Sequence, residues 1–353
     1  MELDVSDEIK NTSATEPHIV LLGAGASRAA FPDGEASGRP LPLMEDFSQI
    51  VPIRPLLEKS GVEWRGRGFE DVYSSLAANP DQASTLAALE AGVYAYFDAL
   101  ALPTQATIYD ALILSLRRKD VIATFNWDPF LIQALRRNCR LAASLPRLLF
   151  LHGNVLAGYC VEHQVAGVKG NRCSSCGSTF VPSQLLYPIS RKNYQGSPLK
   201  AIWQELQGHL RGTLLVTIFG YSAPSTDVEA LDLMSQAWGE WKSRQFEQIE
   251  FIDRKNESDL LQSWKAFVWL GHHDVRRLFR ESWIAKHPRR TIEAFRAQNL
   301  DAAFIADNPL PDTTDLSALQ TWFAPLIAAE SGDAVTACSR RRRRGSTRAA
   351  ADA

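Results

Sequence analysis

An apolar run, Ile19 to Leu22, leads directly into the turn Gly23-Ala24-Gly25-Ala26-Ser27. A buried strand of a parallel sheet that ends over a phosphate-binding turn has this form. Glycine lets the backbone turn sharply and approach a ligand, because it has no Cβ. The amides that follow, at the start of a helix, are expected to face a diphosphate. Arg28 stands where the dinucleotide fingerprint has its third glycine, so a plain strand-to-helix turn remains an alternative.

Strand and helix patterns alternate along most of the chain. Strands are predicted at 18–22, 121–125, 148–151, 213–219 and 248–252, and helices at 84–102, 107–117, 128–135, 199–210 and 228–241. This alternation predicts an α/β fold with a Rossmann-like, doubly wound parallel sheet. The proline- and glycine-rich stretch 31–42 is predicted to be a loop that covers a ligand.

The same patterns suggest a division of the chain. We expect a disordered N-terminus over 1–16, a nucleotide-binding domain over 17–258, a helical region over 259–335 and a disordered, arginine-rich tail over 336–353. The central domain would contain a helical module at 43–118 and an insertion at 157–182. His272 and His273 are expected to lie on a helix and to be structural.

Composition narrows the class of protein. The formal net charge is -2 and 45% of the residues are hydrophobic, as in an ordinary globular protein without a global attraction to nucleic acid. The polar N-terminus does not resemble a secretory signal, and no apolar run has the length of a membrane span. We therefore expect a cytoplasmic protein without a membrane partner. The run Arg340 to Arg344 would contact nucleic acid or, as we prefer, form a solvated end.

Three of the five cysteines cluster. Cys160-x2-His163 and Cys173-x2-Cys176 have the spacing of two knuckles around a tetrahedral zinc ion. Four protein ligands leave no open position, so this would be a structural Zn²⁺ in a small zinc ribbon, unless the clustering is accidental. The remaining cysteines, Cys139 and Cys338, are interpreted as inert.

Polar side chains follow two further predicted strands. Asn126 and Asp128 come after the strand at 121–125, and His152 follows the strand at 148–151. Ligands bind outside the carboxyl ends of such strands. An imidazole there can accept a proton from a ribose hydroxyl or from water. Helix capping by Asn126 and Asp128, and a partly buried structural His152, are the alternatives.

These motifs occur in a recognisable order: Thr124-Phe125-Asn126-Trp127-Asp128, Leu151-His152-Gly153, the Cys/His cluster, and Phe219-Gly220-Tyr221-Ser222. In this order the chain resembles the sirtuin family over residues 17–255. It is most similar to the divergent bacterial branch of sirtuin-like proteins that hydrolyse NAD in antiphage defence.

The resemblance implies roles for individual residues. Asn126 would contact the nicotinamide ribose, Asp128 the carboxamide, and His152 would be the general base. The family's phosphate and ribose contacts carry over to Gly220 and Ser222, beside the turn Gly23 to Ser27. The wider set of NAD-binding residues would also include Thr124 and Asp253, the latter at the adenosine ribose. Asp227 would be either a helix cap or a ligand.

Two departures from the family pattern favour hydrolysis of NAD. Phe31-Pro32-Asp33-Gly34 is not followed by the family's arginine, and Val181 to Pro188 lacks the peptide-binding segment. The prediction is an NAD glycohydrolase, with a protein deacylase or ADP-ribosyltransferase, or a non-catalytic NAD or ADP-ribose sensor, as alternatives. Constant hydrolysis of NAD would poison the host cell, so we expect a protein partner or homo-oligomer to control the activity. The added segments contain Trp264, Trp269 and Trp283, suited to an interface or to the chain's own core.

Overall fold

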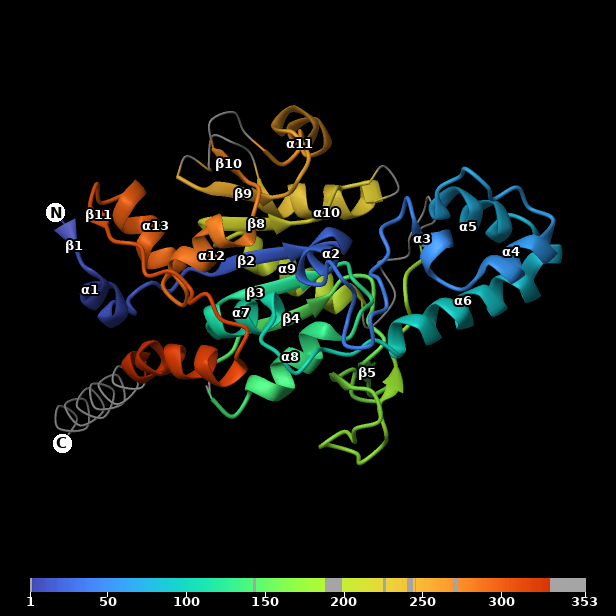
Figure 1. Cartoon of the computed structure of the whole chain (residues 1–353), viewed down its shortest axis with the longest axis horizontal. Helices are drawn as coiled ribbons and strands as arrows, with labels where there is room; N and C mark the ends of the chain where they lie inside the picture. The colour runs from blue at the N-terminus through green and yellow to red at the C-terminus, as the bar shows by residue number, and fades with distance from the viewer. Residues whose placement is uncertain are drawn as a thin grey trace, which may run out of the picture.

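The computed structural model describes residues 2–141, 144–187, 199–224, 227–239, 244, 246–268 and 272–330. Its centre is a six-stranded sheet in which all neighbouring strands are parallel (Figure 1). The strands are β2 (His18–Leu22), β3 (Val121–Thr124), β4 (Arg147–Phe150), β8 (Leu215–Phe219), β9 (Gln248–Ile252) and β10 (His273–Arg276).

The order of the strands confirms the predicted doubly wound fold. Across the sheet they run β10-β9-β8-β2-β3-β4. The chain therefore builds outward from β2 in one direction through β3 and β4, and then in the other through β8, β9 and β10. This is the strand order of the dinucleotide-binding fold, and its switch point lies between β2 and β8. A ligand is expected in the crevice outside the carboxyl ends of these two strands.

A layer of helices covers each face of the sheet. Val20 and Leu22 of β2 face one core, and Ile19 and Leu21 face the other. The first core is packed by α2 (Ala24–Ala30), α7 (Ile108–Ser115), α8 (Phe130–Asn138) and α12 (Trp283–Lys286). The second is packed by α9 (Leu199–Leu210), α10 (Val228–Trp238) and α11 (Glu257–Ser263). All four residues of β2 named here are fully buried, which explains its uninterrupted apolar sequence.

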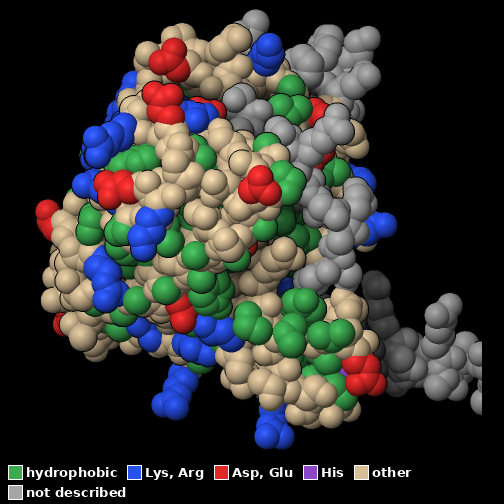
Figure 2. Space-filling model, turned by 90° about the vertical axis from the view of Figure 1, so that its right-hand side faces the viewer, with side chains coloured by type: hydrophobic (Ala, Val, Ile, Leu, Met, Phe, Trp, Pro, Cys, Tyr) green, Lys and Arg blue, Asp and Glu red, His purple; other side chains and the backbone are tan. Residues whose placement is uncertain are grey.

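A helical module extends from the end of the molecule where the carboxyl ends of the strands lie (Figure 1). It contains α3 (Phe47–Ile50), α4 (Arg54–Ser60), α5 (Phe69–Ala77), η1 (Pro80–Gln82) and α6 (Ala83–Asp98). The predicted loop at 31–42 connects α2 to this module without forming a helix or strand. Seen from this end, acidic, basic and apolar side chains are interspersed on the surface (Figure 2).

The insertion after His152 forms a separate small sheet. Its strands are β5 (Ala157–Tyr159), β6 (Ala166–Val168) and β7 (Val181–Pro182), in the antiparallel order β6-β5-β7. Gly167 has no room for a side chain, because a Cβ there would lie 2.0 Å from the Phe180 ring. The predicted insertion at 157–182 thus coincides with a compact ribbon.

The N-terminus is ordered, contrary to the expectation of disorder over 1–16. The strand β1 (Glu2–Leu3) pairs with β11 (Phe304–Ile305), and α1 (Val5–Lys10) begins with a capping box at Asp4. Glu8 of α1 is buried, and its carboxylate lies 2.7 Å from Nδ1 of His287. The polar sequence of this segment did not predict the packing, because the residues that contact it belong to the distant C-terminal region.

The region after residue 258 is not entirely helical, which corrects a second expectation. His273 begins β10, the edge strand of the central sheet, and the backbone carbonyl of the preceding His272 accepts the amide of Ile249 at 3.0 Å. The helix α13 (Thr291–Asn299) and a helix at 316–330 follow. Trp264 and Trp283 are buried in the chain's own core, whereas Trp269, Cys338 and the predicted tail at 336–353 lie outside the described residues.

Two buried arginines fasten the last described helix to the sheet domain. Arg289 donates to the carbonyl of Leu114, and Arg290 donates to the carbonyl of Leu326, each at 2.9 Å. Both guanidinium groups also pair with Glu330. The burial of paired charges with satisfied hydrogen bonds fixes this helix in one place. In the part of the chain that the model describes, no helix is long and apolar enough to cross a membrane.

Candidate functional site

A cavity of about 290 Å³ opens at the carboxyl ends of the central strands. Segments that follow five strands of the sheet contribute to its wall, as expected at a switch point. Most of the predicted site residues line it, namely Ala24, Gly25, Ser27, Asn126, Asp128, His152, Gly220, Ser222 and Asp253. Residues far apart in sequence are thus brought to one place by the strand order.

At the switch point the turns after β2 and β8 touch through glycines. Gly25 donates its amide to the carbonyl of Gly220 at 2.9 Å. A Cβ on Gly25 would lie 2.8 Å from the Gly220 Cα, and a Cβ on Gly220 would lie 2.3 Å from the Ala26 nitrogen. Gly220 also has a φ of 61°, which favours glycine. Glycine is therefore required here mainly so that two backbones can meet.

This contact limits the expected role of the turn in holding a diphosphate. The amides of Gly23, Gly25 and Ala26 donate to the carbonyls of Phe219, Gly220 and Gly23. Gly23 and Ala26 are absent from the cavity wall, so their role is to shape the turn. Within the turn, the wall is formed by Ala24, Gly25 and Ser27.

A compact polar cluster forms the inner end of the cavity. The Ser27 hydroxyl donates to Oδ2 of Asp128 at 2.6 Å and lies 2.6 Å from the Tyr109 hydroxyl. Nδ2 of Asn126 donates to Ser27 Oγ at 3.0 Å and to the Gly23 carbonyl at 2.9 Å. The cluster links the turn after β2 to the turn after β3, so both strands must be in register to form it.

Two supporting residues complete this cluster. Thr124 does not line the cavity; its hydroxyl accepts the amide of Asn126 at 3.0 Å and so shapes the turn beneath it. Tyr109, which the sequence did not indicate, reaches Ser27 from α7. Tyr109 lies in an almost wholly buried helix, where the sequence pattern predicts that an aromatic side chain belongs to the hydrophobic core.

Asp128 is a buried acid. Its side chain lies in the core at 4% exposure, and burial raises its pKa to about 6, while the bonds from Ser27 and from the Phe130 amide counteract this. The bond from the Phe130 amide, at 3.4 Å, is a weak helix cap. Capping thus accounts for one oxygen of Asp128, and the other faces Ser27.

His152 is fixed by its neighbours on both sides. Its ring makes an edge contact with Phe125 at 4.9 Å, and its backbone carbonyl accepts the amide of Leu186 at 2.9 Å. The next residue, Gly153, has a φ of 78°, and a Cβ there would lie 2.1 Å from the Gln184 carbonyl oxygen. The chain therefore turns sharply after His152 and leaves its ring against the cavity wall.

The outer end of the cavity contains Ser222 after β8 and Asp253 after β9. Oδ1 of Asp253 accepts the amide of Lys255 at 2.9 Å, and Lys255 also lines the wall. Ser225 and Thr226, between this segment and Asp227, lie outside the described residues. This end of the cavity thus combines an acidic and a basic side chain near the surface.

The helical module supplies a wall that the sequence did not predict in detail. The linking segment and the module contribute Leu41, Pro42, Leu43, Met44, Glu45, Phe47, Glu70 and Phe97. Arg28 donates from Nε to the carbonyl of Leu41 and pairs with Asp46, at 2.5 Å in each case. The arginine that replaces the third glycine of the fingerprint thus holds the covering segment in place.

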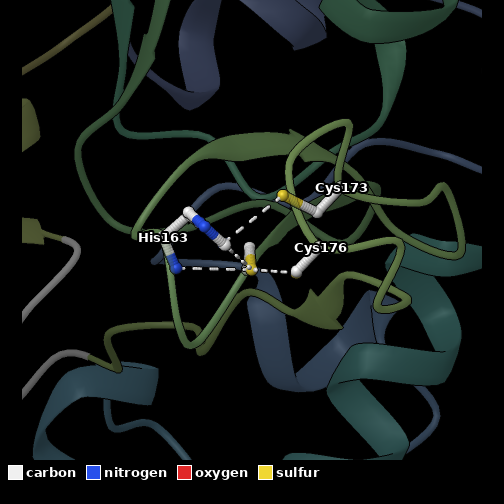
Figure 3. A group of neighbouring side chains, drawn as sticks. His163, Cys173 and Cys176 are labelled. Carbon is white, nitrogen blue, oxygen red and sulfur yellow. Dashed lines mark hydrogen bonds between the residues drawn. The ribbon is translucent and has the colours of Figure 1, made fainter.

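The Cys/His cluster is brought together as predicted (Figure 3). None of its four residues lines the cavity. Sγ of Cys160 lies 3.5 Å from Sγ of Cys176 and 3.7 Å from Nδ1 of His163, which in turn lies 3.9 Å from Sγ of Cys173. Zinc with bonds of about 2.1 to 2.3 Å needs ligand atoms about 3.6 to 3.8 Å apart. The four side chains therefore fit a tetrahedral zinc ion.

The electrostatics of the cluster also suit a metal. The amides of Cys176 and Ser175 lower the pKa of Cys173 to about 7, which favours the thiolate that binds zinc. Cys139 is exposed and lies apart from the cluster.

Comparison with known proteins finds similarity in structure only. No family model and no curated protein sequence matches the chain. A Sir2 homologue in complex with NAD is 15% identical, with a TM-score of 0.42, over 84% of this chain and 97% of the other. A structure described under the mechanism and regulation of Sir2 enzymes is 14% identical, with a TM-score of 0.37, over 83% and 100%.

A third similar structure is a mutant Sir2 homologue bound to ADP-ribose. It is 11% identical to this chain, with a TM-score of 0.35, over 75% of this chain and 95% of the other. Similarity at this level does not establish the chemistry, which rests on the residues of the cavity.

Proposed function

We propose that the protein hydrolyses the N-glycosidic bond of NAD, releasing nicotinamide and ADP-ribose. The observation on which this rests is that Ser27, Asn126, Asp128 and His152 line one cavity at the switch point of a dinucleotide-binding sheet. A buried carboxyl, an amide and an imidazole around one concave site are the groups that such a reaction needs.

The order of the strands suggests how NAD would lie. Asp128 follows β3, Gly25 follows β2, Ser222 follows β8 and Asp253 follows β9, and these four strands are consecutive in the sheet. An extended dinucleotide would place nicotinamide at the inner cluster and the adenosine ribose near Asp253. The diphosphate would then cross the glycine contact between β2 and β8.

In this arrangement, hydrolysis of NAD needs only water and involves no oxidation or reduction. The bond between the ribose C1′ and the nicotinamide nitrogen breaks, and its electron pair neutralises the pyridinium. Water adds to C1′ and gives its proton to His152, which returns it to solvent. Because the leaving group is already cationic, the site mainly has to orient the ribose and stabilise an oxocarbenium-like sugar.

The inner cluster suits the carboxamide of nicotinamide. Ser27, whose hydroxyl accepts a hydrogen bond from Asn126, fixes the Asp128 carboxyl, which would accept a hydrogen bond from the carboxamide when ionised. Its raised pKa, about 6, keeps it largely ionised at neutral pH while leaving it sensitive to mild acid. Asn126 would then reach the nicotinamide ribose.

The segment after the ribbon favours hydrolysis over deacylation. Leu186 is bonded to the His152 backbone, and the Tyr187 ring stacks on Tyr73 at 5.0 Å. Tyr187 also packs against Trp127 at 5.1 Å and donates to the Glu90 carbonyl at 3.0 Å. The Tyr187 side chain is committed to internal packing, and the segment lacks the family's peptide-binding sequence. NAD-dependent deacylation or ADP-ribosyl transfer is therefore the weaker candidate.

The zinc site would be structural. Cys160, His163, Cys173 and Cys176 would fill the coordination shell of the ion, and none of them lines the cavity. When bound, the ion would stabilise the ribbon that follows His152.

We further propose that access to the cavity is regulated, as an effector of bacterial antiphage defence would require. The covering segment is held by Arg28 through partly exposed contacts with Leu41 and Asp46, which a partner or second copy could displace. Light scattering with and without candidate partners, while NAD loss is followed, tests this. A monomer fully active alone and unresponsive to partners would contradict it.

The proposed reaction is tested by incubating the purified protein with NAD, with and without an acylated peptide, and resolving the products by chromatography. Equal amounts of nicotinamide and ADP-ribose, independent of peptide, are expected. Peptide-dependent nicotinamide release with an acylated ADP-ribose product would instead indicate a deacylase. Saturable NAD binding without any turnover would indicate a sensor.

A further inference from the structure

Asp227 faces His152 rather than the helix it precedes. It occupies the position before α10, where an aspartate usually accepts a backbone amide, but its side chain makes no such capping bond. Its Oδ1 lies 3.9 Å from Nε2 of His152, and its Oδ2 accepts the Tyr221 hydroxyl at 2.7 Å. The carboxylate therefore joins a tyrosine on one side and the imidazole on the other.

The surroundings of this group strengthen the pairing. His152, Tyr221 and Asp227 are 6%, 6% and 3% exposed. A carboxylate beside an imidazole at such burial is weakly screened by water, so its charge stabilises the protonated form of the ring, against the cost of burying that charge. A buried carboxylate is costly unless it accepts hydrogen bonds, and the Tyr221 hydroxyl supplies such a bond to Asp227.

An aromatic stack holds the two partners in place. The Phe125 ring stacks on Tyr221 with centroids 3.9 Å apart and an interplanar angle of 7°. The same ring makes the edge contact with His152. One side chain thus sets the positions of both the imidazole and the tyrosine whose hydroxyl fixes Asp227.

Other charged groups share the cavity and bear on the protonation of His152. They are Glu45, Glu70, Asp128, Asp253 and Lys255, in addition to Asp227 itself. The Ser27 hydroxyl donates to Asp128 and accepts a hydrogen bond from Asn126. These three residues therefore form a hydrogen-bond network of their own. Among these charged groups, Asp227 is the one with a recorded ion-pair distance, 3.9 Å, to Nε2 of His152 in the described part of the chain.

We propose that Asp227 is a positioning residue that orients the His152 imidazole and makes it a stronger base, with Tyr221 holding the carboxylate. The inference rests on the proposed function for its catalytic meaning. As water attacks C1′, its proton moves to His152, and the imidazolium that forms is stabilised by Asp227, which stays ionised. The proton then passes to solvent, so no additional reactant is needed.

The pairing itself can be tested without any assumption about substrate. The protonation of His152 is followed by NMR on labelled protein, with its signals among those of the seven histidines assigned from a His152→Gln sample. In Asp227→Asn the midpoint of the His152 titration is expected to fall by roughly one pH unit or more. Tyr221→Phe keeps the aromatic stack and should give a smaller fall.

A matched control comes from the same helix. Asp232 of α10 is exposed and does not line the cavity, so Asp232→Asn removes an equal charge without touching His152. It should leave the titration of His152 unchanged. If Asp227→Asn fails to fold, Tyr221→Phe and Asp232→Asn form the comparison, and equal midpoints in these two would overturn the proposal.

Kinetics with NAD separate this inference from the proposed function. Asp227→Asn should lower kcat by roughly tenfold or more with KM little changed, and move the acid limb of the pH profile to lower pH. An active wild type whose His152 titration is the same in Asp227→Asn overturns the inference. A wild type that stays inactive under all activating conditions, but in which Asp227 still shifts that titration, supports the pairing and overturns the NAD assignment.

Discussion

The Ser27 hydroxyl donates to Oδ2 of Asp128 at 2.6 Å, across the gap between the turns that follow β2 and β3. Both residues are buried, so this bond forms in a region that water does not screen. It explains why a serine ends the glycine turn: the hydroxyl counteracts the effect of burial on the nearby acid. The bond makes the position of Asp128 depend on the turn after β2.

Removing this hydroxyl is expected to impair the site. Ser27→Ala should lower kcat/KM for NAD by roughly 10- to 100-fold, the value of a hydrogen bond to a charged group. Because the Ser27 bond lowers the pKa of Asp128, its loss should also shift activity to higher pH. Steady-state pH profiles measure both effects. Ser258→Ala on the exposed side of α11 is the control and should match the wild type.

The close contact at the switch point predicts that replacing glycine by alanine has opposite effects on stability at Gly25, which makes the contact, and at Gly208, which does not. A Cβ on Gly25 would lie 2.8 Å from the Gly220 backbone, whereas a Cβ on Gly208 of α9 meets nothing within 4 Å. Gly25→Ala should therefore destabilise the protein by about 1 to 3 kcal/mol. Gly208→Ala should stabilise it by about 0.5 to 1 kcal/mol. Denaturant unfolding of both variants checks this, and equal effects would refute the close contact.

Zinc should be essential to the ribbon. Elemental analysis of protein purified without chelator is expected to give one zinc per chain. Cys176→Ser should remove the metal and lower thermal stability, because binding energy at a structural zinc is folding energy. Cys139→Ser, at an exposed cysteine outside the cluster, should change neither. Metal-free wild-type protein of undiminished stability would rule the site out.

A buried histidine predicts a specific pH dependence of stability. His18 lies between the hydroxyls of Thr217 at 2.8 Å and Thr291 at 3.0 Å, and burial lowers its pKa to about 3. A histidine with a lowered pKa in the folded state stabilises the fold above its unfolded pKa, about 6.5. This contribution is lost as pH falls from about 6.5 toward 3.

Replacing His18 by glutamine should therefore flatten the response to acid. Between about pH 7.5 and about pH 5, His18→Gln should lose about 2 kcal/mol less unfolding free energy than the wild type. His209→Gln, near the end of α9, is the control and should follow the wild-type curve. Parallel curves for His18→Gln and the wild type would show that His18 is not buried in its neutral form.

Local pattern was sufficient to predict five of the six described strands of the central sheet. The bounds of β2 and β9 agree with the predicted strands, because each is a run of residues buried on both faces. The edge strand β10 was missed, since His273-Asp274-Val275-Arg276 has neither an apolar run nor clear alternation. It is a strand because β9 offers it backbone hydrogen bonds, which is a tertiary cause.

The site was predictable where residues follow strands, and unpredictable where support comes from elsewhere. Asn126, Asp128 and His152 were found from their positions after strands, and the cysteines from their spacing. Tyr109 was not, because within a buried helix a tyrosine that contacts the site resembles one that fills the core. Asp227 was interpreted equally as a cap or a ligand, and only its side-chain geometry distinguishes these.

The most direct test of the central claim is a time course of NAD incubated with the wild type, Asn126→Ala and His152→Ala, followed by proton NMR. For the wild type, the nicotinamide signals of NAD should convert to free nicotinamide and ADP-ribose in equal amounts. Each variant should be slower by at least the roughly 10²-fold typical of losing a positioned acid–base group. Intact NAD with the wild type under all activating conditions, or wild-type rates in both variants, would contradict the assignment of this cavity as an NAD-hydrolysing site.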